Sequence, residues 1–210
     1  MKNHAFGAYV WKTKFLPTEM QGQFFDDYDV ITKVRGYDEH KEDLRVSVPL
    51  WELMERRETP KMIMYHCVGL DGWLHNAGNP NHEFAKAGVA HYDHVFRELV
   101  SRVDDQTTII AFGDHGFDVD NDHGEEGIDI LSTMVFVYQK SGLPMKKKYM
   151  ENIEKFRKID MNFKNVDVPA SASLIMDTAF PFANFGVFHP ALAPHDDLNL
   201  LRKRMVQNLE

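Results

Sequence analysis

Residues 107–125 read TTIIAFGDHGFDVDNDHGE, and this stretch decides the fold and the function that the rest of the chain is expected to have. Its first six residues are mostly β-branched or aromatic and end at a glycine, which is typical of a short strand buried on both faces. Asp114 and His115 follow the carboxyl end of that strand, where open α/β sheets place their ligand sites. A carboxylate and an imidazole can hold the same divalent ion at about 2.0–2.2 Å. His123 comes eight positions after His115 and can return to the same crevice.

A second strand with ligand-type residues after it lies upstream. Residues 61–68 (KMIMYHCV) form another apolar run, and an aspartate and a histidine follow it. The two strands are expected to bring five metal ligands to one edge of a sheet: Asp71, His75, Asp114, His115 and His123. Two metal ions about 3.5–4 Å apart are the usual way in which such a set serves phosphoryl chemistry. Asp-His-Gly alone is a common turn, so the second group of residues is what favours the metal site.

The remaining pattern predicts an α/β fold in which helices cover a largely parallel sheet. A third apolar strand is expected at residues 133–138, and another strand at 29–33. Ser47 and Asn81 are polar residues of the kind that cap helix starts, and each precedes a helical pattern. Helices are expected at residues 47–58, 82–103, 149–159 and 198–209, and from Pro169 onward.

Length and composition indicate one domain over residues 1–210, with 43% hydrophobic residues available for a core. The formal net charge of −8 leaves no basic stripe for phosphates, which argues against nucleic acid as a partner. Cys67 is the single cysteine, so no disulfide can form within the chain. No run of about 18 apolar residues is present, and lysines interrupt the first 16 residues, so neither a membrane span nor a signal peptide is expected.

The ligand pattern carries a resemblance to a known family. Asp71-x-x-x-His75, followed by two Asp-His-Gly triplets, resembles the binuclear zinc set of the alkaline phosphatase superfamily. Within it the pattern is most similar to the glycosylphosphatidylinositol (GPI) ethanolamine phosphate transferases, whose two triplets have the same eight-residue step. Residues 167–169 (DVP) and 180–186 (FPFANFG) are similar to a helix start and a turn of that family.

The resemblance is best over residues 60–190 and weak over residues 1–45. The opening residues 1–11 look like the middle of the family's domain, so the fold is expected to be an alkaline-phosphatase-like domain truncated at its N-terminus. Three residues stand where the family has, or commonly has, glycine: Leu74, Asn121 and Glu125.

The resemblance implies zinc as the cofactor, with two ions in the complete family domain. Asp71, His75 and His123 resemble the ligands of one ion, and Asp114 and His115 resemble part of the ligand set of the other. The family's nucleophilic threonine and a further aspartate lie upstream of the first triplet, so no catalytic residue is assigned in this chain. Catalytic zinc normally keeps three protein ligands, so we expect one zinc at the three-ligand site and little or no phosphoryl transfer by this chain alone.

The activity that the resemblance implies is transfer of ethanolamine phosphate from phosphatidylethanolamine to a mannose of the GPI glycan. It further implies a GPI glycolipid substrate, a membrane-protein subunit as partner, and the endoplasmic reticulum lumen or membrane as the location. Two alternatives stay open: a non-catalytic zinc-binding or interaction domain derived from that family, and a soluble phosphodiesterase of the same superfamily.

Two other groups have ligand-like spacing, and each has a simpler interpretation. His91 and His94 lie one turn apart on the helix expected at 82–103, and we interpret them as surface or boundary residues because the family's ligand set is filled elsewhere. Residues 118–122 (DVDND) begin like a calcium-binding EF-hand loop. Position six of that loop is His123 instead of glycine, and no flanking helices are expected, so the calcium interpretation fails.

Overall fold

The computed structural model describes residues 3–7, 27–30, 37–56, 62–77, 79–120, 122–124, 126–143, 151, 163–182, 184–193, 197, 199, 202–203 and 206. The chain divides into two compact units. The first comprises Met1–Arg102 and Gly116–Leu131, and the second comprises Val103–His115 and Ser132–Glu210. Among the described residues, none of the helices is both long enough and apolar enough to cross a bilayer.

The first unit contains a parallel three-stranded sheet with the strand order β2-β1-β3. Its strands are β1 (Asn3–Gly7), β2 (Asp27–Val30) and β3 (Met62–His66). Ala5 of β1 lies opposite Tyr28 on one side and Met64 on the other. The sequence predicted β3 and a strand close to β2, but it missed β1, whose Asn, His and Gly residues interrupt any apolar run.

The long helix α2 (Tyr37–Glu55) begins ten residues before the helix expected at 47–58. The prediction that Ser47 caps the helix is wrong. Its hydroxyl lies inside the helix and donates to the backbone carbonyl of Leu44 at 2.7 Å, which is a usual partner for a serine within a helix.

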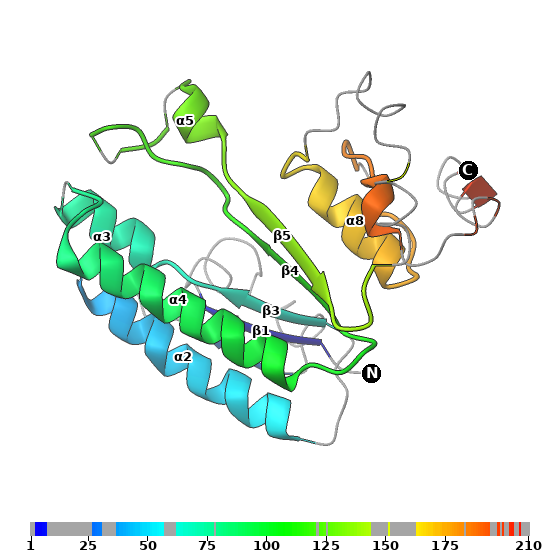
Figure 1. Ribbon diagram of the computed structural model, residues 1–210, viewed down its shortest axis with the longest axis horizontal. Helices are drawn as coiled ribbons and strands as arrows, with labels where there is room; N and C mark the ends of the chain where they lie inside the picture. Colours follow the sequence, from blue (N-terminus) through cyan, green and yellow to red (C-terminus); the bar gives the residue numbers. More distant parts are fainter. Residues whose placement is uncertain are drawn as a thin grey trace. The chain divides into compact units, whose positions relative to one another are not determined.

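The core of the first unit forms where α2 and α4 meet the parallel sheet, and Figure 1 shows these elements packed together. Leu50 and Leu53 of α2 are 1% and 2% exposed. Their apolar neighbours come from three elements of the unit and are Trp51, Met54, Ile63, Tyr65 and Leu99. Burying a leucine side chain contributes about 1.5–3 kcal/mol, so α2 is firmly held on the sheet.

A short helix, α3 (Gly69–Ala77), which the sequence pattern did not predict, starts three residues after β3 ends. α4 (Glu83–Arg102) follows at the expected place, but its capping hydrogen bond comes from His82, whose Nδ1 accepts from the amide of Phe84 at 3.3 Å. The expectation of Asn81 as the cap was therefore one residue early.

Trp73 holds α3 against α4. A Cβ added to Gly88 of α4 would lie 3.0 Å from the Trp73 ring, so the glycine is what lets the two helices approach this closely. The ring of Phe84, which is also on α4, packs against Trp73 with ring centroids 5.8 Å apart. Trp73 is 4% exposed, so a buried aromatic side chain fixes the position of α3.

The second unit contains an antiparallel pair, β4 (Thr108–Phe112) and β5 (Val135–Gln139). Ile110 lies opposite Val137 at its centre. Both strands were expected, but the prediction that they extend a parallel sheet is wrong. Thr108 lies opposite Gln139 and Phe112 lies opposite Val135, which is an antiparallel register. Among the described residues between the two strands lies the four-residue helix α5 (Ile128–Leu131).

The expected burial of β4 on both faces is also wrong. Its first four residues are half-buried, and Phe112 is 48% exposed. In β5, Val135 and Phe136 are 37% and 42% exposed. An apolar run of this length identifies a strand but does not establish that both of its faces are covered.

The second unit also contains α8 (Asp167–Ile175), which starts two residues before Pro169. The buried carboxylate of Asp167 accepts from the amide of Lys164 at 2.9 Å and from the amide of Val187 at 2.8 Å. A small core forms where Leu174 of α8 meets Ala193, just after η2 (Pro190–Leu192), with Phe180 and Phe188 against it. The helices expected at 149–159 and 198–209 fall, apart from isolated positions, outside the described residues.

Candidate metal centre

α3 places an aspartate and a histidine on the same side of one helical turn. Asp71 lies in its first turn and His75 in its last, four residues apart, which is the spacing that brings side chains together on a helix. The Nε2 atom of His75 lies 3.6 Å from the Oδ1 atom of Asp71. The sequence pattern identified both residues, and the helix places their side chains on the same face.

The segment 116–131 brings a second histidine to the same aspartate. His123 Nε2 lies 3.3 Å from Asp71 Oδ1, and the rings of His75 and His123 have centroids 4.8 Å apart. Phe117 packs edge-on against both imidazoles, with centroid distances of 5.7 Å to His75 and 5.6 Å to His123. This aromatic contact limits the directions in which the two rings can turn.

A tight turn sets where His123 lies. The Oδ1 atom of Asp118 accepts from the amides of Asp120 and Asp122, both at 2.9 Å. The amide of Asp118 donates to the carbonyl of Asp122 at 3.1 Å, which closes the turn. Hydrogen bonds among Asp118, Asp120 and Asp122 therefore stabilise this acidic turn. Asp122 comes directly before His123, so the turn also places that histidine.

The distances around Asp71 fit a divalent ion. Two ligands of a tetrahedral ion at about 2.0–2.2 Å lie about 3.4 Å from each other. The Asp71–His123 and Asp71–His75 atom pairs, at 3.3 Å and 3.6 Å, are close to that value. One carboxylate oxygen and two imidazole nitrogens are also a donor set that such ions accept. Each of these two pairs therefore has a distance that two ligands of one ion can have.

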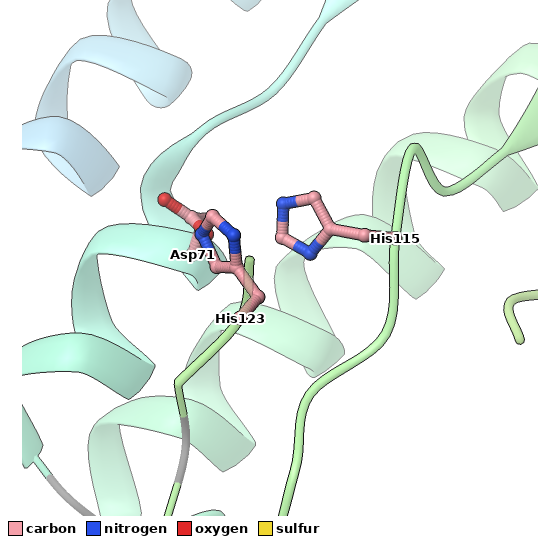
Figure 2. A group of neighbouring side chains, drawn as sticks. All are labelled: Asp71, His115 and His123. Carbon is pink, nitrogen blue, oxygen red and sulfur yellow. The ribbon is translucent and has the colours of Figure 1, made fainter. Parts of the chain in front are cut away.

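His115 adds a further candidate ligand. Ligand atoms of Asp71, His115 and His123 all lie within 4.8 Å of one another, and Figure 2 shows the three side chains as neighbours. His115 is the last residue of its segment in the second unit and is joined directly to Gly116 of the first. Within the residues that the structure describes, no other group of three or more His, Cys, Asp or Glu side chains is arranged to hold an ion.

Asp114 does not take part in that group. Its side chain is 75% exposed, and its Oδ1 atom accepts from the amide of His115 at 3.1 Å. The backbone carbonyl of Asp114 accepts from the side-chain amide of Asn165 at 2.7 Å. The expected division into a three-ligand ion and a separate ion at Asp114 and His115 stays a prediction.

The sequence missed two residues that shape the centre. Asp122 lies with its Oδ1 atom 3.8 Å from Nδ1 of His75, on the opposite side of the ring from Asp71. A carboxylate at the second nitrogen of a ligating histidine commonly orients the ring and fixes its tautomer. The second residue that the sequence missed is Phe117. The only indication of its role in the sequence is its position between the two Asp-His-Gly triplets. His94, a rejected candidate, is an exposed residue of α4.

The sequence profile of a family described as type I phosphodiesterase / nucleotide pyrophosphatase matches residues 1–168. The chain belongs to that family. Its relatives confirm the resemblance seen in the motifs. GPI ethanolamine phosphate transferase 3 of Saccharomyces cerevisiae is 28% identical over 58% of this chain and 12% of its own length. GPI ethanolamine phosphate transferase 2 of Yarrowia lipolytica is 26% identical over 100% of this chain and 25% of its own length.

A human relative extends this comparison. GPI ethanolamine phosphate transferase 3, catalytic subunit, of Homo sapiens is 27% identical over 86% of this chain and 15% of its own length. This phosphodiesterase-family chain therefore spans a quarter or less of the length of each of these three relatives. No solved structure matches it.

Proposed function

We propose that this chain forms part of a zinc-dependent phosphoryl-transfer site that moves ethanolamine phosphate onto a mannose of the GPI glycan. The observation that carries the proposal is the convergence of His75 and His123 on one oxygen of Asp71, at 3.6 Å and 3.3 Å. The names of the relatives, all GPI ethanolamine phosphate transferases, support the substrate class.

In this proposal Asp71, His75 and His123 hold one zinc ion, and His115 is a candidate for a further position on it or for a second ion. Bound zinc would neutralise charge on the phosphoryl oxygens and lower the pKa of an attacking hydroxyl. The carboxylate of Asp71 reduces the net charge of the site, and the two imidazoles must be neutral to donate their Nε2 lone pairs. The Oδ1 atom of Asp122 lies 3.8 Å from the Nδ1 atom of His75, and a hydrogen bond between them in the zinc-bound protein would favour the tautomer that leaves Nε2 free.

The partners follow from the same proposal. The substrate is a GPI glycolipid, the donor is phosphatidylethanolamine, and the location is the endoplasmic reticulum lumen or membrane. One relative is named as a catalytic subunit, which supports a further subunit as partner of this chain. That this partner is a membrane protein stays a prediction. The prediction that the chain alone transfers little ethanolamine phosphate stays a prediction. Mass spectrometry of a mannose-containing acceptor incubated with phosphatidylethanolamine would test it.

The experiment that tests the metal centre is zinc content after saturation and removal of loosely bound ions. We expect about one zinc per chain in the wild type and a large loss in His123→Ala and in His75→Ala. His94→Ala is the matched control, because it removes an exposed imidazole that is remote in the sequence from the two Asp-His-Gly triplets. Equal zinc content in the His123→Ala and His94→Ala variants would reject the proposed centre.

The family description supports a second candidate function, hydrolysis of a phosphodiester by water. The two activities differ in the acceptor, so the product distinguishes them. Release of free phosphoethanolamine without its appearance on mannose would favour the phosphodiesterase. Zinc binding without either product would favour the non-catalytic metal-binding domain.

A further inference from the structure

A buried carboxylate lies beneath the helix that carries the metal ligands. Asp43 of α2 is 0% exposed, and its side chain accepts hydrogen bonds from two backbone amides and a tyrosine hydroxyl. Oδ1 accepts from the amide of Val68 at 3.1 Å, and Oδ2 accepts from the amide of Gly69 at 2.7 Å. Oδ2 also accepts from the hydroxyl of Tyr92 on α4, at 2.8 Å.

Tyr92 extends this network along α3. Its hydroxyl oxygen accepts from the amide of Leu70 at 3.0 Å while the hydroxyl proton is donated to Asp43. Burial raises the pKa of the Tyr92 hydroxyl, and the negative charge of Asp43 raises it further, so the proton stays in place. Tyr65 donates in turn to the backbone carbonyl of Asp43 at 2.9 Å, which fixes this turn of α2 against β3.

The contacted amides are the ones that a helix cannot satisfy by itself. The first N–H groups of a helix have no partner within it, and α3 begins at Gly69. A carboxylate there makes charge-assisted bonds and opposes the positive end of the helix dipole. Asp43 is 26 residues away from Gly69 along the chain, so it caps α3 from another element instead of from the helix's own sequence.

We propose that Asp43 is a positioning residue for the metal centre, because its carboxylate fixes the first turn of α3 and thereby the directions of Asp71 and His75. The inference rests on the proposed function, since it assumes that these two residues bind the ion. Asp71 is the third residue of α3, so a tilt of the first turn moves its carboxylate directly. α2 supplies a rigid base for Asp43, because Val46, one turn further on, is 0% exposed.

Asparagine at this position tests the role of the charge with little change of shape. An asparagine side chain has one accepting oxygen, and its NH₂ group only donates, so it cannot satisfy Val68, Gly69 and Tyr92 together. Tyr92→Phe is the milder companion, because it removes one hydroxyl and leaves the two amide bonds of Asp43. Leu53→Ala is the control, since it weakens the core around α2 without touching the cap of α3.

The measurement is the affinity for zinc alone, by competition with a chromophoric chelator. We expect Asp43→Asn to bind zinc about tenfold more weakly, as is typical when an outer-shell partner of a metal site is lost. Tyr92→Phe should be weaker by about threefold, and Leu53→Ala should keep the wild-type affinity. Hydrogen exchange of the metal-free chain should show faster exchange at Val68, Gly69 and Leu70 in Asp43→Asn than in Leu53→Ala.

The outcomes separate this inference from the proposed function. Wild-type zinc affinity in Asp43→Asn, in a wild type that binds zinc, would overturn the positioning role alone. If Asp43→Asn does not fold, unchanged affinity in Tyr92→Phe would overturn it equally. An equal loss of affinity in Leu53→Ala would show a general effect of stability and reject the specific role. A wild type without zinc would overturn the proposed function and this inference together.

Discussion

Replacing Gly186 with alanine should destabilise the second unit strongly. A Cβ at this position would lie 1.8 Å from the carbonyl oxygen of Val166 and 2.4 Å from its carbonyl carbon. Both are backbone atoms at the start of α8, so the two segments must separate by more than about 1 Å to restore ordinary contact. The amide of the next residue, Val187, donates to buried Asp167 at 2.8 Å, and this bond would break as the segments part.

The size of the effect follows from these two losses. A hydrogen bond to a charged group contributes about 1.5–3 kcal/mol, and forcing atoms into a packed site costs about 1–3 kcal/mol. We therefore expect Gly186→Ala to lower the free energy of unfolding by about 3 kcal/mol or more, against a total of about 5–15 kcal/mol for a domain. Gly142→Ala is the control in the same unit: its added Cβ meets no atom within 4 Å, so only the left-handed backbone, at a φ of 83°, opposes it.

The assay is urea denaturation followed by far-UV circular dichroism, with hydrogen exchange of the α8 amides as the local measurement. Tryptophan fluorescence would be a poor choice, because all three tryptophans precede residue 103 and so lie in the first unit. Gly142→Ala should lose only about 1–2 kcal/mol. A Gly186→Ala variant with the wild-type midpoint, or with the same shift as Gly142→Ala, would refute the reasoning.

Three further predictions concern the first unit and its centre. Burial raises the pKa of the Cys67 thiol, so the stability that this group contributes is complete below about pH 8.5 and is lost as the pH rises. In urea titrations at pH 7.5 to 10, Cys67→Ala should therefore reduce the fall in the free energy of unfolding by about 1.4 kcal/mol per pH unit. Parallel curves for the wild type and the variant would contradict this. Asp118→Ala should lower zinc affinity severalfold in a chelator competition, because the turn before His123 loses two hydrogen bonds, and an unchanged affinity would show that the turn does not place the ligand. His75→Ala should weaken zinc binding more than His115→Ala, because His75 shares helix α3 with Asp71 and its Nε2 atom lies 3.6 Å from the Asp71 carboxylate. The reverse order, measured in the same way, would assign the ion to His115 instead.

Much of the centre could be predicted from the sequence because its ligands follow apolar strands. β3 and β4 both lie within predicted runs, and the repeated Asp-His-Gly triplet identified His115 and His123. What the pattern could not give was that one oxygen of Asp71 lies near both His75 and His123. Its contact with His123 joins residues that are far apart in the chain, and only the folded structure determines such a pairing.

α3 was missed for a related reason. Its sequence, GLDGWLHNA, contains two glycines, and helices this short are marginal by themselves. Trp73 and the cap from Asp43 stabilise it, and both are tertiary contacts. Asp43 itself lies in the charged run HKEDLR, where nothing local separates it from Glu42 or Arg45, whose side chains pair with each other at 2.9 Å on the surface.

The antiparallel pairing of β4 and β5 also depended on information beyond the local pattern. Apolar content predicts a strand but not the direction of its partner. That direction is fixed by pairs of residues far apart in the chain, such as Ile110 with Val137.

The convergence of Asp71 and His123 has a thermodynamic consequence for the chain. Because these two side chains are about 50 residues apart in the sequence, an ion that needs both of them would bind the folded chain and not the unfolded one. Binding would then stabilise the first unit by mass action. The first unit would then melt at a temperature that rises with free zinc and falls on chelation, so metal supply would govern its lifetime as well as its chemistry.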